Sequence, residues 1–137
     1  MKMPPRIWKQ PGSRSSVIPG QTIIFHASVL GALPIRYQWL RDGAVIPGET
    51  NIWLALSGVQ YAQRGMYQFI ATNDFGAVTS QVANLDILQS PQVTQGVQPQ
   101  TVVAGTKASL TVTAIGSAPL HYQWMCNGVA LNDGGSI

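Results

Sequence analysis

The chain has 137 residues, of which 45% are hydrophobic and 9% are charged. Most polar positions hold Gln, Ser, Thr or Asn, and 14 glycines and 9 prolines interrupt the chain, which favours short strands and turns over helices. The net charge of +3 comes from the first 14 residues, which contain four cations and no acid. The remaining residues contain four cations and five acids and are nearly neutral. This distribution argues against a nucleic-acid-binding surface.

The sequence also argues against a membrane span and against a disulfide. No stretch approaches the roughly 20 apolar residues that a membrane span needs, so we expect no membrane insertion within these residues. Cys126 is the single cysteine, so no intrachain disulfide can form. The first 12 residues are charged and lack an apolar stretch, so any secretion signal is expected outside this sequence.

The chain repeats itself with an offset of 85 residues. The phrase Tyr-Gln-Trp occurs at residues 37–39 and again at 122–124, and a turn pair follows each copy, Asp-Gly at 42–43 and Asn-Gly at 127–128. Further matches at the same offset are Gly20 with Gly105, Gly31 with Gly116, and Pro34 with Pro119. Fixed spacing between several unlike residues indicates two copies of one domain.

The first copy begins with alternating strands. Residues 22–29 and 35–40 each alternate between inward and outward side chains, as half-buried strands do. The expected inward positions are Ile23, Phe25, Ala27, Val29, Ile35, Tyr37 and Trp39. The Asp-Gly pair that follows tolerates the positive φ angles of a tight hairpin turn.

The second half of the first copy continues the pattern. Residues 54–59 mark a strand and its exit, residues 67–71 mark another, residues 71–76 predict a hairpin, and residues 78–88 form the last strand. The apolar positions of the first two segments are Leu54, Leu56, Val59, Tyr67, Phe69 and Ala71. Seven or eight short strands separated by turns predict an all-β, antiparallel β-sandwich.

Several of these features occur together in a known family. They are Gly20 before the second strand, Trp39 in the third, the Leu-x-Leu-x-x-Val run at 54–59, the Gly-x-Tyr step at 65–67 and the turn at 73–76. Residues 5–87 thus resemble an immunoglobulin-like domain of the intermediate type, most closely the tandem copies in large extracellular bacterial proteins. The resemblance implies a complete domain over residues 1–89, with its core at 5–88.

The resemblance assigns roles to core residues. Tyr67 is expected to form a tyrosine corner, in which its hydroxyl bonds back to the backbone. The paired cysteines of the family map to Ala27 and Phe69, and the first of them maps to Val112 in the second copy. The expected structural core is Ala27, Trp39, Leu54, Tyr67, Phe69, Val112 and Trp124.

Two departures from the family change what stabilises the fold. The missing disulfide would contribute about 4 kcal/mol in the chain-entropy model, and burying Phe69 against Ala27 is expected to return roughly 1.5–3 kcal/mol. Folding is then independent of oxidation. Gln63 stands where the family usually has Asp before the Gly-x-Tyr step, so the usual ion pair across the sandwich is not expected.

Residues 90–137 match only the first half of the domain and end before its last three strands, E to G. So short a segment rarely buries enough surface to fold alone. We therefore expect the chain to be a fragment of a longer tandem array. The alternative is a half-domain that another chain completes through strand exchange.

The sequence offers no convincing catalytic or metal site. Its acids lie mostly in turn-like stretches, where solvation or turn hydrogen bonds explain them. His26 and His121 lie in different copies, and Cys126 has no evident base or helix N-terminus to activate it. We therefore expect no catalytic residue, no cofactor and no metal.

One set of side chains predicts a surface contact patch. Trp8 follows the inward Ile7, and Trp53 precedes the inward Leu54, so alternation directs both indoles outward. In the immunoglobulin-like arrangement their strands flank the strand of His26. Trp8, His26 and Trp53 are thus expected to form a partly exposed patch suited to a sugar ring or a neighbouring module. The alternative is that each Trp covers local apolar surface.

These observations favour a non-catalytic immunoglobulin-like module of a secreted or cell-surface bacterial protein. It would act as a spacer or adhesion element beside neighbouring immunoglobulin-like domains in the same chain. Its ligand would be a protein or a glycan. The alternative is an accessory carbohydrate-binding module of an extracellular polysaccharide-acting enzyme, with Trp8 and Trp53 as ligand contacts.

Overall fold

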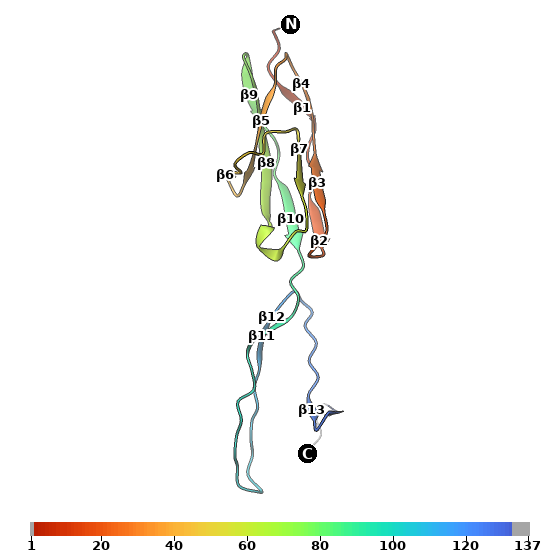
Figure 1. The fold of residues 1–137 in the computed structure, drawn as a ribbon, viewed down its shortest axis with the longest axis vertical. Helices are drawn as coiled ribbons and strands as arrows, with labels where there is room; N and C mark the ends of the chain where they lie inside the picture. The colour runs from red at the N-terminus through yellow and green to blue at the C-terminus, as the bar shows by residue number, and fades with distance from the viewer. Residues whose placement is uncertain (1, 133–137) are drawn as a thin grey trace. The chain divides into compact units, whose positions relative to one another are not determined.

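The computed structural model describes residues 2–132, and these form strands and one short 3-10 helix, η1 (Tyr61–Gln63). The chain divides into two compact units, Met1–Leu88 and Gln89–Ile137 (Figure 1). No helix in the described part is long and apolar enough to cross a membrane.

Unit 1 is a two-layer sandwich. One layer is a six-stranded sheet in the order β2-β10-β8-β5-β6, with β9 also paired to β8. Its strands are β2 (Arg14–Val17), β5 (Arg36–Arg41), β6 (Ala44–Val45), β8 (Gly65–Asn73), β9 (Gly76–Thr79) and β10 (Ala83–Ile87). The other layer contains the pairs β1–β4 and β3–β7. Its strands are β1 (Arg6–Lys9), β3 (Ile23–His26), β4 (Ser28–Leu30) and β7 (Trp53–Leu56).

The predicted all-β sandwich is confirmed, with one difference in strand direction. All strand pairs in unit 1 are antiparallel except β2 with β10, which run parallel. The first strand divides in two: β1 pairs with β4 in one layer, and β2 joins β10 in the other. The buried Pro11 lies between them, where a residue without an N–H can interrupt the hydrogen-bond ladder.

The core lies where the inward rows of the two layers meet. Phe25, Trp39, Leu54 and Phe69 are fully buried, and Tyr67 is 1% exposed. The rings of Phe25 and Tyr67 stack at 5.3 Å between centroids, and those of Trp39 and Phe69 lie 5.1 Å apart. Such aromatic pairs stabilise a core beyond the area that they bury. Ala27, expected in the core, is half-buried and packs against this cluster.

The last strand is interrupted where the sequence predicted one continuous strand over residues 78–88. β9 pairs with the second half of β8 and β10 with its first half, and the chain bends away between them. The buried Ser80 accounts for the break. Its hydroxyl accepts a hydrogen bond from the Phe69 N–H at 2.9 Å, while its own N–H donates to the Phe69 carbonyl at 2.8 Å. A side chain thereby replaces a ladder partner.

The repeated phrase Tyr-Gln-Trp has a structural explanation. Trp39 is a core residue, and its neighbour Gln38 holds the following hairpin: Gln38 Nε2 donates to the carbonyl of Ile46 at 2.8 Å and to that of Trp39 at 3.0 Å. In unit 2, Gln123 Nε2 makes the same two bonds, to Leu131 at 2.8 Å and Trp124 at 3.0 Å. The turn pairs also match, since both residues of each pair have positive φ.

Unit 2 contains two hairpin-like pairs, β11 (Gln92–Gln95) with β12 (Thr113–Ile115) and β13 (Met125–Cys126) with β14 (Val129–Ala130). Here the expected core is not formed. Trp124 is 37% exposed and Val112 is only half-buried, and both line an open hollow. The reason is that residues 89–132 contain no counterpart of β7 and β8, which bury Trp39 in unit 1.

The glutamine bonds predict a specific loss of stability. Gln38→Met keeps the length of the side chain but leaves the Ile46 carbonyl without its donor, so we expect unfolding free energy to fall by about 1–3 kcal/mol. Gln68→Met on the adjacent strand β8 is the matched control, because the Gln68 side chain makes no hydrogen bond within the described residues. Urea denaturation followed by circular dichroism measures both, and equal losses would contradict the assignment.

Candidate functional site

The three residues of the predicted contact patch lie on strands of the smaller layer of unit 1, and all three are exposed. Trp53 on β7 is directly opposite His26 on β3, and both are exposed, Trp53 by 47%. Trp8 on β1 is 67% exposed and lies at a bulge, where Ile7 pairs with Val29 and Lys9 with Ser28. The structure thus pairs His26 with Trp53 and places Trp8 on the neighbouring segment, opposite the continuation of the same strand.

Trp8 and Trp53 do not stack on each other. Among the described residues, neither indole packs ring to ring on another aromatic side chain, whereas the four core rings all do. Ile24, two residues before His26, adds a 39% exposed apolar side chain. Flat indole faces beside a polar imidazole can cover a sugar ring or an apolar surface. This chemistry suits binding.

No cluster of metal ligands is found in the part of the chain that the structure describes. Residues 2–132 contain no group of three or more His, Cys, Asp and Glu side chains that could hold a metal ion. Cys126 is exposed on β13 in unit 2.

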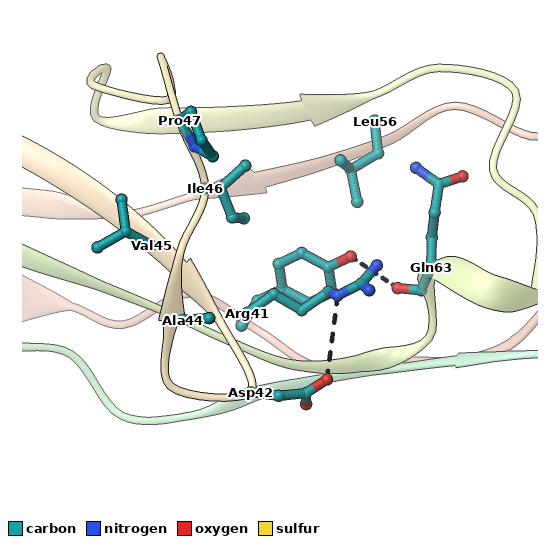
Figure 2. Close-up of a pocket in the computed structure, with 9 residues that line it drawn as sticks. Arg41, Asp42, Ala44, Val45, Ile46, Pro47, Leu56 and Gln63 are labelled. Atoms are coloured by element: carbon teal, nitrogen blue, oxygen red, sulfur yellow. Dashed lines mark hydrogen bonds and ion pairs between the residues drawn. The ribbon is translucent and has the colours of Figure 1, made fainter.

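A second hollow opens at the end of the unit 1 sandwich, where β5 and β8 meet η1 (Figure 2). Alternation along β5 directs Arg41 to the same side as Trp39, and Arg41 pairs with Tyr67 across the sheet. The Arg41 guanidinium therefore lies at the rim of the core. An Arg at an inward-facing position is the sequence signal for this site, and the prediction of a turn pair at residues 42–43 does not include it.

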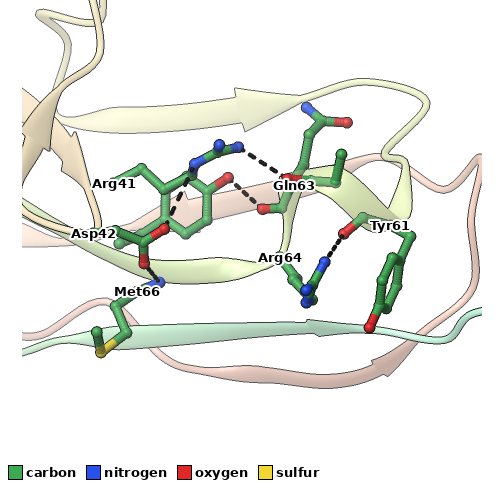
Figure 3. A network of polar contacts seen from close by, with 8 residues as sticks. Arg41, Asp42, Tyr61, Gln63, Arg64 and Met66 are labelled. Carbon is green, nitrogen blue, oxygen red and sulfur yellow. Dashed lines mark hydrogen bonds and ion pairs between the residues drawn. The ribbon is translucent and has the colours of Figure 1, made fainter. Parts of the chain in front are cut away.

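The polar contacts beside this hollow fix the chain around Tyr67 (Figure 3). The Tyr67 hydroxyl donates to the Gln63 carbonyl at 2.6 Å, which is the geometry expected of a tyrosine corner. Arg41 Nη1 donates to the Ala62 carbonyl at 3.3 Å. Asp42 accepts from the Met66 N–H at 2.9 Å. Gln63, where the family has Asp, instead accepts the Gln60 N–H at 2.8 Å.

Asp42 also explains the Gly-x-Tyr step. Gly65 has a φ of +154°, and a Cβ at this position would lie 2.9 Å from both carboxylate oxygens of Asp42. Only glycine lets the carboxylate approach the backbone closely enough to reach Met66. The hairpin turn after β5 is thereby tied to the start of β8.

Comparisons with known proteins identify the fold. No family model matches the chain. Mouse hemicentin-2 is 31% identical over 134 residues (93% of this chain, 3% of that protein), and Drosophila melanogaster sidekick is 29% identical over 136 residues (93% and 6%). Human leucine-rich repeats and immunoglobulin-like domains protein 3 is 26% identical over 143 residues (90% and 13%). The chain spans less than a fifth of the length of these curated relatives.

Solved structures give the same result. A titin fragment, I67–I69, superposes with a TM-score of 0.63 at 22% identity, covering 95% of this chain and 49% of that one. Sidekick-1 immunoglobulin domains 1–5 superpose with a TM-score of 0.67 at 11% identity, covering 96% and 28%. At these identities the likeness concerns the fold, which is that of tandem immunoglobulin-like domains.

The exposure of the two indoles predicts that they contribute little to folding. Trp8→Ala should lower the unfolding free energy by less than about 1 kcal/mol, because Trp8 is 67% exposed, and Trp53→Ala should cost about 1–2 kcal/mol, because Trp53 is 47% exposed. Trp39→Ala, which empties a fully buried site, is the contrasting variant and should cost about 3–5 kcal/mol. Thermal unfolding measures all three. A large loss for either exposed Trp would show that it covers local core instead.

Tyr67 predicts a decline of stability at alkaline pH. Burial raises the pKa of Tyr67 above its usual value of 10.0, although the nearby positive charge of Arg41 acts in the opposite direction. Above about pH 10 the unfolded chain therefore loses a proton that the folded chain keeps, and stability falls as pH rises. Below that pH the contribution is fully present.

Tyr67→Phe should lower stability at pH 8 by about 0.5–1.5 kcal/mol, through loss of the bond to Gln63. The gap to wild type should narrow as pH rises above about 10, because the variant lacks the titrating group. Urea midpoints between pH 8 and 11 measure this. A gap that stays constant would show that the hydroxyl of Tyr67 does not carry the pH dependence.

Proposed function

We propose that this chain is a non-catalytic immunoglobulin-like module of a larger extracellular or cell-surface protein, acting as a spacer or as an adhesion element. The observation that carries the proposal is the repetition of one hairpin arrangement, with Gln38 in unit 1 and Gln123 in unit 2 making the same pair of bonds. Repeated modules on a single chain set distances between other parts of a protein.

The connection between the units supports a spacer. Only residues 88–91 separate the end of β10 from the start of β11, and this connection ends with Pro91. Short connections that contain proline sample fewer conformations than Gly/Ser-rich linkers do. In this proposal residues 90–137 correspond to the first half of a second domain, because β11 to β14 match the early strands of unit 1 at offsets of 85 to 86.

The secreted location, the bacterial origin and the intermediate type of the domain belong to the same proposal. They rest on the sequence resemblance, and the curated relatives named above come from mouse, fly and human. The neighbouring immunoglobulin-like domains would be the immediate partners, and a protein or glycan would be the ligand.

Small-angle X-ray scattering of the full chain tests the spacer. We expect a narrow distribution of maximum dimensions for wild type and a broader one after insertion of Gly-Ser-Gly-Ser behind Gln89, because the insertion loosens the connection. Equal breadth in both proteins would show that the connection is already flexible, and the spacer proposal would fail.

The exposed patch favours a second candidate, an accessory carbohydrate-binding module. Trp8 and Trp53 present large indole surfaces to solvent on the same layer, with His26 beside Trp53. A glycan array probed with the full chain tests this candidate. Binding that Trp8→Ala and Trp53→Ala each abolish would support it, whereas binding that both variants retain would exclude the patch as the contact.

A further inference from the structure

The hollow beside Arg41 has the composition of a ligand pocket. Its volume is about 480 Å³, within the roughly 300–1,000 Å³ typical of small-ligand sites. Val45, Ile46 and Leu56 provide apolar walls, Tyr67 forms part of the lining, and Arg41, Asp42 and Gln63 are polar lining residues (Figure 2). Mostly apolar walls with a few placed polar groups are the usual pattern of a binding site.

Two of these three polar residues, Arg41 and Gln63, offer donors to the pocket. Arg41 uses Nη1 on the Ala62 carbonyl, and its Nη2 has no hydrogen-bond partner within the described residues. Gln63 Oε1 accepts a hydrogen bond from the Gln60 N–H, which leaves the Gln63 Nε2 as a donor for a ligand. Figure 2 shows this nitrogen on the side of Leu56. A ligand with hydrogen-bond acceptors, such as a carboxylate, would therefore pair with these two donors.

Asp42 does not neutralise this site. Its carboxylate lies 3.9 Å from Arg41 Nε, with both side chains about half-exposed, and ion pairs of this kind are weak in water. Its Oδ1 is bound to the Met66 N–H. In Figure 2 Asp42 lies on the other side of the Arg41 guanidinium from Ile46 and Leu56, so the apolar part of the pocket faces the cation. Arginine binds planar carboxylates especially well.

The neighbouring sheet edge indicates what carries the carboxylate. β7, which contributes Leu56 to the pocket, pairs with β3 alone within the described residues, so its other edge has unpaired backbone groups. Such an edge can accept an extended peptide as an additional strand. A free aliphatic acid would make no use of these groups.

We propose that this pocket binds the carboxyl terminus of a peptide that ends in an apolar residue. The terminal carboxylate lies on Arg41 and Gln63, the apolar side chain packs between Ile46 and Leu56, and the preceding backbone follows the free edge of β7. This site uses other side chains than the Trp8/His26/Trp53 patch, although Trp53 also lies on β7, and it does not depend on the spacer function.

Nuclear magnetic resonance titration of the full ¹⁵N-labelled chain tests the site. The probes are acetyl-Gly-Ala-Leu with a free carboxylate, the same peptide as its carboxyl-terminal amide, and octanoate. We expect the acid to shift the amide resonances near Arg41, Leu56 and Ala62, and the amide form to bind at least tenfold more weakly. Equal affinity of acid and amide would overturn the proposal.

Variants locate the binding groups. Arg41→Gln should weaken the acid at least tenfold, whereas Arg36→Gln, on the same strand but paired with Asp74, is the matched control and should leave affinity unchanged. Val45→Asp places a carboxylate on a 57% exposed wall residue, so it should weaken the acid similarly without unfolding the domain. Wild-type affinity in both pocket variants would overturn the site. Octanoate binding as tightly as the peptide acid would overturn the peptide as its occupant.

Discussion

The packing of four aromatic rings in the centre of unit 1 is the interaction on which the rest depends. Phe25 comes from one layer, and Trp39, Tyr67 and Phe69 come from the other, with neighbouring ring centroids 5.1 to 6.2 Å apart. Phe69 stands where the resemblance to immunoglobulin-like domains implies a cysteine. Dispersion and apolar burial therefore join the two layers without a covalent bond, and the fold of this unit does not depend on the redox state of its surroundings.

The surface features follow from the same alternation that builds this core. Because Trp39 faces inward, Gln38 faces away from the core, where its amide holds the next hairpin, and Arg41 returns to the inward side just beyond the last buried ring. Inward rows that end in a charged residue create a rim with both apolar and polar groups. The outward positions of the other layer leave Trp53 and His26 together by the same rule.

Unit 2 shows how far local sequence can build such a structure. Its turn, its glutamine bonds and its strand pairs match those of unit 1, because each depends on residues close together in the chain. Burial of Trp124 does not follow, since a buried Trp needs side chains from an opposing layer, and the described residues of unit 2 supply none. In this protein, therefore, the local hydrogen bonds of the hairpin form without burial of the adjacent Trp.

The sequence by itself determined the strand pattern, the inward rows, the turn pairs and the outward direction of both indoles, since each depends on period-two alternation or on a residue pair that tolerates positive φ. It also indicated the contact of the Tyr67 hydroxyl with the backbone. Only the tertiary structure decided that Ser80 interrupts the last strand, that β2 runs parallel to β10, and that Arg41 and Gln63 border one pocket. These features join residues far apart in the chain, and their geometry depends on how the two layers pack.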